Sequence, residues 1–194
     1  MTVFLLSPAH CGGRRARMLL DGQGTFALAA RLRESGAAIG DVFTFLSGLY
    51  FRGKLSYGRA FGRPLLIVPG RGLMQPDTVV TVEDLRAIAE IGVELEEPRF
   101  TEPLRRDAAS LAASLDAATH VVLLGSIATG KYVDVIESHL GGRLRFPSEF
   151  VGRGDMSRGG LMLRCVAAGA ELTYVAIPGA ARRGKRPPRL APVR

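Results

Sequence analysis

Short apolar runs alternate along this chain with longer segments in which apolar residues recur every three to four positions. The apolar runs are typical of strands buried on both faces of a sheet and cover residues 3–6, 64–68, 120–124, 143–146 and 171–177. The periodic segments predict helices over residues 14–20, 25–34, 42–51, 82–91, 101–118, 131–140 and 156–168. Because strands and helices alternate, we expect an α/β three-layer sandwich with a mainly parallel central sheet of about four to five strands.

The same pattern predicts one domain over residues 1–178, followed by a basic, proline-rich tail at residues 179–194. No apolar run reaches the roughly 18 residues of a membrane span, and the apolar N-terminus lacks the basic segment of a signal peptide. Two cysteines, Cys11 and Cys165, cannot form a disulfide framework and indicate a reducing cytoplasm. The histidines and cysteines lack metal-ligand spacing, so we expect neither a metal nor another cofactor.

Residues 119–136, THVVLLGSIATGKYVDVI, predict a buried strand, a glycine loop and a helix, whose first backbone N–H groups favour anions. Gly125, Gly130 and Lys131 match most of a phosphate-binding P-loop, but Tyr132 stands where that motif needs Ser or Thr to hold magnesium. No convincing apolar run ending in Asp supplies the second metal-binding acid. We therefore favour a loop that binds an anion or a base, with a P-loop-like nucleotide enzyme as an alternative.

Four loops follow predicted strands, at residues 7–13, 69–77, 125–131 and 147–157, and carry glycine, proline and functional groups. Ligands of parallel α/β sheets bind outside the carboxyl ends of the strands, so these loops converge if the strands are parallel. We expect the loops and the helix starts beside them to bind a base through Gln75, Ser7, Ser126 and Tyr132. Phosphate contacts are expected from Arg14, Arg15, Arg71, Lys131, Arg153, Ser157 and Arg158.

The net charge of +8 is unevenly distributed along the chain. Residues 77–107 hold nine acids and four arginines, a net charge of −5, which leaves +13 on the remainder. Most of the positive charge is arginine, whose guanidinium can donate two hydrogen bonds to one phosphate. This asymmetry favours a nucleic-acid partner over a merely charged surface.

Residues 51–64, FRGKLSYGRAFGRP, interleave aromatic and basic side chains and are interrupted by glycines. Aromatic rings among cations can stack on bases while the cations bind phosphates. We interpret this segment as a loop. The alternative is an ordinary surface loop whose aromatic side chains pack into the core.

Asp155 is the first candidate for a catalytic carboxylate. It lies between Arg153 and Arg158 at a predicted helix start, where the positive end of the helix favours a negative charge. Such a carboxylate could activate water or stabilise a cationic sugar. The alternative is that Asp155 only caps the helix, a role that Ser157 could also take.

Asp77 and His10 are the other catalytic candidates. Asp77 follows Gln75, whose amide offers the donor and acceptor needed to recognise a base edge, although Asp77 also fits a simple turn. His10 lies in the loop after the first strand and could stabilise a departing base, or serve a structural role.

Four segments together resemble the uracil-DNA-glycosylase-like α/β superfamily: SPAHCGGRRARML, LIVPGRGLMQPD, VVLLGSIATGKY and FPSEFVGRGDMSRGG. The closest branches are the phage-defence DNA glycosylases and the domains associated with deazaguanine transglycosylases. The resemblance implies four strand-end loops around a flipped base, with an acid or Asn in the first loop and a late His. Here the first loop has no Asp, and the last has no His-Pro-Ser motif.

The resemblance therefore implies a DNA N-glycosylase that flips out and excises a base, a modified one above all, and leaves an abasic site, in a role such as anti-phage defence. Its acid would be Asp155 or Asp77. Two alternatives stay open: a non-catalytic module that binds nucleic acid or a nucleotide, and the P-loop-like nucleotide enzyme. We expect neither a membrane association nor an obligate protein partner.

Overall fold

A six-stranded sheet forms the centre of the protein, whose computed structural model describes residues 1–21, 24–116, 118–188 and 190. The strands stand in the order β4–β3–β1–β6–β7–β8. The four inner strands are parallel, and each edge strand is antiparallel to its neighbour. Their bounds are Thr2–Leu6 (β1), Gly62–Val68 (β3), Gly72–Met74 (β4), Val121–Leu124 (β6), Leu144–Pro147 (β7) and Tyr174–Ala176 (β8).

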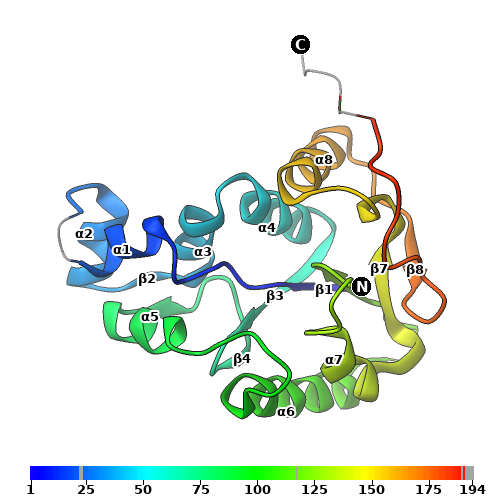
Figure 1. The fold of residues 1–194 in the computed structure, drawn as a ribbon, viewed down its shortest axis with the longest axis horizontal. Coiled ribbons are helices and arrows are strands. Elements are labelled where there is room, and N and C mark those ends of the chain that lie inside the picture. Colours follow the sequence, from blue (N-terminus) through cyan, green and yellow to red (C-terminus); the bar gives the residue numbers. More distant parts are fainter. Residues whose placement is uncertain (22–23, 117, 189, 191–194) are drawn as a thin grey trace.

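Helices cover both faces of this sheet, as the α/β sandwich prediction requires (Figure 1). One layer contains α3 (Ile39–Ser47), α4 (Leu49–Phe61) and α8 (Asp155–Ala168), and the other contains α6 (Pro98–Ser114) and α7 (Val133–Leu140). A smaller group beyond the carboxyl end of β1 consists of α1 (Arg14–Leu20), α2 (Ala27–Glu34), α5 (Val82–Ala89), β2 (Ala37–Ala38) and β5 (Val79–Val80). Among the helices described, none has the length and apolar character needed to cross a membrane.

The central strand β1 aligns the carboxyl ends of its two neighbours. Leu6 of β1 is in register with Leu66 of β3 and with Leu124 of β6, and all three side chains are fully buried. The chain continues from β1 to β3 on one side and later reaches β6 on the other. The connections therefore diverge above the β1–β6 pair, which is where parallel α/β sheets bind their ligands.

The segment predicted as a glycine-interrupted loop at residues 51–64 is instead mostly helix, because α4 extends to Phe61. Its glycines allow close packing. A Cβ on Gly53 would lie 2.6 Å from the carbonyl oxygen of Gly159 in α8, and a Cβ on Gly58 would lie 2.9 Å from the Cβ of Pro64. The loop prediction was wrong because these glycines serve tertiary contacts and not turns.

The predicted loop at residues 69–77 contains a strand, β4, which returns antiparallel along β3. Gly70 and Gly72 adopt positive φ angles of 76° and 80° at the reversal. Because β4 runs back along the sheet, Gln75 and Asp77 at its end are carried away from the carboxyl edge. The antiparallel edge strands β4 and β8 also bring the sheet to six strands.

The long helix α6 is displaced toward the N-terminus relative to the predicted residues 101–118. Pro98 occupies its first turn, and the carboxylate of Glu97 accepts a hydrogen bond from the backbone N–H of Arg99 at 3.1 Å. This cap starts the helix earlier than Thr101. The helix ends at Ser114, where Leu115 adopts an extended conformation.

The described part of the basic tail lies against the loop before α8. Gly152 has a φ angle of 74°, and a Cβ there would collide with the backbone carbonyl of Lys185. Gly184 similarly packs on Val151. The tail residue Arg189 lies outside the described residues.

Candidate functional site

Two glycines bring the first turns of α4 and α8 together above the carboxyl end of β1. A Cβ on Gly159 would lie 2.6 Å from the carbonyl oxygen of Leu49, just as a Cβ on Gly53 would meet Gly159. Without these Cβ atoms the two backbones touch. Since β7 is parallel to β6 and leads through a short loop into α8, the start of α8 also lies at the carboxyl edge of the sheet.

Lys54 of α4 is buried beneath this helix pair, with only 1% of its surface exposed. Its Nζ donates hydrogen bonds to the carbonyl oxygen of Ser7 at 2.6 Å and to Ser7 Oγ at 2.9 Å. It also lies 4.4 Å from the ring centroid of Tyr50 and 4.7 Å from that of Phe51. Two neutral oxygens and two rings therefore replace the carboxylate partner that a buried lysine ordinarily has.

Burial lowers the pKa of Lys54 from 10.5 to about 7. The negative charge of Asp155 opposes this shift, whereas the positive charge of Arg158 reinforces it. The amine can therefore exchange a proton near neutral pH, a property that is common among functional side chains.

The hydroxyl of Tyr50 is buried beside Ser7 and Arg158 and has no hydrogen-bond partner of good geometry among the residues that the structure describes. A buried polar atom without a partner costs free energy, so this hydroxyl is an unusual feature of the helix pair. Burial raises the pKa of Tyr50, which keeps its proton in place as a donor.

Arg158 is held rigidly next to this hydroxyl. Its guanidinium donates to the carbonyl oxygen of Phe150 through Nε at 3.2 Å and Nη2 at 3.1 Å, and it lies 5.3 Å from the centroid of the Phe150 ring. Its Nη1 is 4.0 Å from Asp155 Oδ1. Arg158 thus retains one nitrogen that faces the carboxylate.

Asp155 is the first residue of α8, and its side chain is 69% exposed. Its charge raises the pKa values of Lys54, Tyr50 and Tyr132, so the carboxylate lies near all three side chains. The arrangement is a solvent-facing acid near a group of buried hydrogen-bond donors. We call the group Ser7, Tyr50, Lys54, Tyr132, Asp155 and Arg158 the carboxyl-edge cluster.

A cavity of about 480 Å³ opens on the loops that follow β1, β3 and β6. Among the residues that line it are His10, Pro69, Glu94 and Lys131. Tyr132 directly follows the cavity residue Lys131. Burial raises the pKa of Tyr132 to about 12, and the charges of Asp155 and Glu94 add to the shift. The predicted residues His10 and Lys131 thus lie in the cavity, and Lys131 Nζ pairs with Glu94 Oε1 at 2.9 Å.

Of the predicted site residues, Ser7, Tyr132, Asp155 and Arg158 come together, whereas Asp77 and Gln75 do not join them. Asp77 Oδ1 pairs with Nη2 of Arg59 at 2.5 Å, on a different face of α4 from Lys54. Gln75 is exposed, and its backbone carbonyl oxygen accepts a hydrogen bond from the N–H of Thr78, which closes a turn.

Several predicted phosphate contacts are engaged within the protein. Arg15 donates to the carbonyl oxygen of Phe45 at 3.0 Å, and Arg71 pairs with Asp84 at 2.6 Å. Arg153 donates to Ser157 Oγ at 3.2 Å. Arg14 is exposed on α1, and the predicted base contact Ser126 accepts a hydrogen bond from the N–H of Ala128 at 3.3 Å.

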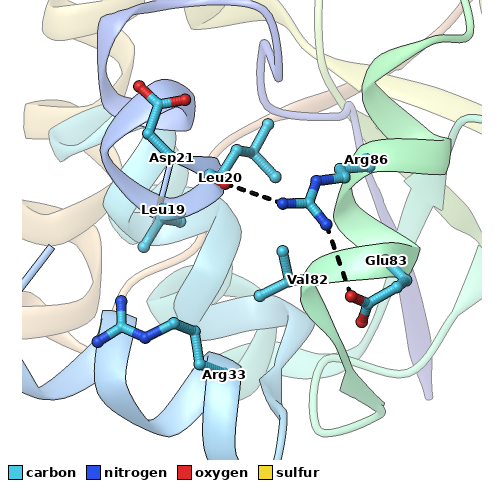
Figure 2. Close-up of a pocket in the computed structure, with 7 residues that line it drawn as sticks. All are labelled: Leu19, Leu20, Asp21, Arg33, Val82, Glu83 and Arg86. Atoms are coloured by element: carbon cyan, nitrogen blue, oxygen red, sulfur yellow. Dashed lines mark hydrogen bonds and ion pairs between the residues drawn. The ribbon is translucent and has the colours of Figure 1, made fainter. Parts of the chain in front are cut away.

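A separate hollow of about 260 Å³ lies between α1, α2 and α5 (Figure 2). Arg86 crosses it and donates to the carbonyl oxygen of Leu20 at 3.1 Å, while also pairing with Glu83 at 3.5 Å. Arg33 donates to the carbonyl oxygen of Gly24. Both arginines serve the junction of these helices, so the carboxyl-edge cluster is the better candidate site.

Sequence reasoning missed Lys54 because it lies in the segment predicted as a loop. It missed Tyr50 because this residue directly precedes that segment. A helix continued through Gly53 and Gly58 would have placed Tyr50, Lys54 and Tyr57 on one stripe. A lysine on an otherwise apolar stripe is the signal that could have identified the site. No cluster of three potential metal ligands occurs among the residues that the structure describes.

In comparisons with known proteins, no family model, curated protein or solved structure matches the chain.

Proposed function

We propose that the protein is a DNA N-glycosylase whose active site is the carboxyl-edge cluster. The observation that carries the proposal is the position of Asp155, an exposed carboxylate near buried hydrogen-bond donors at the switch point of the sheet. The cavity that His10 and Lys131 line offers space for a flipped base. The positive charge outside residues 77–107 favours a polyanionic substrate.

In the proposed reaction, Asp155 stabilises the cationic character that develops on the sugar and accepts a proton from the attacking water. The water oxygen bonds to C1′ of the sugar as the bond between C1′ and the base nitrogen breaks. The base departs with the electron pair of that bond. Tyr132 contacts the base, and the Arg158 guanidinium, with Nη1 4.0 Å from Asp155 Oδ1, attracts the carboxylate.

The test uses the purified protein with unmodified DNA, uracil-containing DNA, heavily modified phage DNA and tRNA. Released base is measured by mass spectrometry and abasic sites by alkaline strand breakage, without added metal. We expect base release from a DNA substrate, and we expect Asp155→Asn to reduce it by at least about 10²-fold while binding persists.

The matched control is Asp41→Asn. Asp41 also lies in the first turn of a helix, α3, but its carboxylate pairs with Arg31 at 2.7 Å outside the cluster. This variant should retain full activity. Salt-sensitive binding without any base release would instead identify a non-catalytic module. Magnesium-dependent activity that is abolished by Lys131→Ala would identify the P-loop-like enzyme.

A further inference from the structure

A cleft of about 450 Å³ lies between α1 and the segment that leads into α2. Its volume falls within the roughly 300–1,000 Å³ of small-molecule sites. Its lining includes Arg14, Arg17 and Met18 of α1, with Thr25 and Phe26 of the segment that follows. Its lining residues do not belong to the carboxyl-edge cluster, and Figure 1 shows α1 and α2 at one end of the molecule, away from α8. We call it the arginine cleft.

The two arginines of the cleft are free to bind a ligand. Arg14 and Arg17 are exposed, and among the described residues neither guanidinium has a hydrogen-bond or ion-pair partner. Arg15 of the same helix, in contrast, donates to the carbonyl oxygen of Phe45 at 3.0 Å. Two free guanidinium groups in one cleft favour a phosphate, to which arginine can donate paired hydrogen bonds.

An apolar wall stands next to these cations. The ring of Phe26 lines the cleft and stacks on Phe45, with centroids 4.9 Å apart and planes inclined by 24°. Met18 is 44% exposed and adds a thioether to the wall. Aromatic rings and thioethers both pack well against planar rings. Cations beside an aromatic side chain are the combination that binds the phosphate and the base of a nucleotide.

Asp21 places one carboxylate in the same cleft. It also borders the neighbouring hollow, but Figure 2 shows its side chain pointing away from Arg33 and Arg86. A carboxylate repels a bare phosphate, whereas it accepts hydrogen bonds from the amino and hydroxyl groups of a nucleotide. The charges of the cleft therefore fit a ligand with an anionic end and a donor-bearing end.

Close packing fixes the walls of the cleft in place. A Cβ on Gly24 would lie 2.7 Å from the carbonyl oxygen of Met18 and 2.9 Å from the Cβ of Ala29, so the segment fits tightly against both helices. Arg33 Nη1 also donates to the carbonyl oxygen of Gly24 at 2.9 Å. A cleft held by such contacts is formed before a ligand arrives, which reduces the entropic cost of binding.

We propose that the arginine cleft is a nucleotide-binding site. Arg14 and Arg17 bind the phosphate, while Phe26 and Met18 contact the base. Asp21 accepts a hydrogen bond from the base or the sugar. The ligand is a free nucleotide or an unpaired nucleotide of a single strand, which share this chemistry. The proposal does not depend on the glycosylase function, because it concerns a separate cleft and involves no reaction.

The experiment is isothermal titration calorimetry with the 5′-monophosphates of the deoxynucleosides, the nucleosides themselves and inorganic pyrophosphate. We expect at least one nucleotide to bind more tightly than its nucleoside and than pyrophosphate. Arg14→Gln combined with Arg17→Gln should weaken nucleotide binding by at least about tenfold. Phe26→Leu should weaken it by about fivefold and leave pyrophosphate binding unchanged.

The matched control combines Arg105→Gln with Arg106→Gln. Both arginines are exposed on α6, so this variant removes the same charge outside the cleft and should bind nucleotides as the wild type does. Titration of a single-stranded trinucleotide then separates the two sources. Equal affinity for the trinucleotide and the best mononucleotide identifies a free nucleotide as the ligand, whereas tighter binding of the trinucleotide identifies a single strand.

Nucleotide binding that survives the loss of Arg14 and Arg17 would overturn the proposal, as would an equal loss in the α6 control. Pyrophosphate binding as tight as that of every nucleotide would also overturn it. The absence of binding by all nucleotides and by the single strand would do the same. If Phe26→Leu fails to fold, by circular dichroism, Met18→Ala tests the base contact, and unchanged nucleotide affinity in that variant refutes it.

Discussion

At the scale of one residue, burial of the Lys54 ammonium lowers the stability of the fold. Its ammonium is removed from water and placed against two neutral oxygens and two rings, with no carboxylate in direct contact. Burial lowers its pKa because the charged form loses its hydration. Below about pH 7 the full cost applies, and the difference from the ordinary pKa of 10.5 corresponds to about 5 kcal/mol.

The lowered pKa of Lys54 predicts how the free energy of unfolding depends on pH. Between about pH 7 and 10.5 the unfolded chain holds a proton on Lys54 that the folded chain lacks, so the free energy of unfolding rises with pH. We expect a rise of up to about 1.4 kcal/mol per pH unit in urea denaturation between about pH 7 and 8.5. Burial also raises the pKa of Cys11 to about 12, which lowers stability at higher pH and sets the upper limit of the window.

Lys54→Met is the comparison, since methionine fills the same space without a charge. Its free energy of unfolding should be nearly constant over this window, so the difference between the two proteins should shrink as pH rises. A parallel rise in both proteins would show that other groups cause the slope. The measurement needs no substrate, so it tests the state of the amine separately from the reaction.

At the scale of elements, the contact between α4 and α8 positions the site. Gly53 and Gly159 allow the two backbones to touch, and this contact brings Asp155 and Arg158 near Tyr50 and Lys54. An added Cβ at either glycine would meet backbone atoms at 2.6 Å, which cannot rotate away. The helices would have to separate.

We therefore expect Gly159→Ala to lower the free energy of unfolding by about 1–3 kcal/mol and to reduce base release. Gly160→Ala is the matched control one residue along the same helix, where the nearest atom is Leu190 Cδ1 at 3.6 Å. This control should be neutral or stabilising by up to about 1 kcal/mol, because Ala favours helix more than Gly. Equal losses in both variants would mean that helix propensity, and not the contact with α4, decides stability.

This contact also explains which parts of the structure the sequence could predict. The strands β1, β3 and β6 follow directly from local apolar runs, as does the alternation that gives the layered α/β fold. The helix α4 does not follow from the local sequence, because Gly53 and Gly58 there indicate a turn. Only the close contacts with Gly159 and Pro64 explain why these two positions are glycine. Likewise, the reversal into β4 depends on pairing with β3, and this pairing separates Asp77 from Asp155.

For the whole molecule, the separation of charge suggests how a polyanion would orient. Residues 77–107, the acidic flank, neutralise several of their own arginines, as in the pairs of Arg86 with Glu83 and Arg99 with Glu97. The tail, in contrast, presents exposed arginines beside the first turn of α8, where Arg153, Ser157 and Arg186 line one hollow. A DNA backbone that follows the tail would pass next to Asp155.

This orientation predicts which arginines set the salt dependence of binding. Each phosphate contact contributes about 0.9 to the slope of log affinity against log salt concentration on duplex DNA. If Arg182 and Arg186 each bind one phosphate, changing both to Gln should reduce the slope by about two, as measured by fluorescence anisotropy with a labelled duplex. Arg99→Gln is the control, because Glu97 already pairs with Arg99 at 2.7 Å and lies on the acidic flank. Equal slopes for wild type and the double variant would place the DNA path elsewhere. A reduced slope would tie the basic tail to the carboxyl-edge cluster, since the hollow that Arg186 lines also borders the first turn of the helix that begins with Asp155.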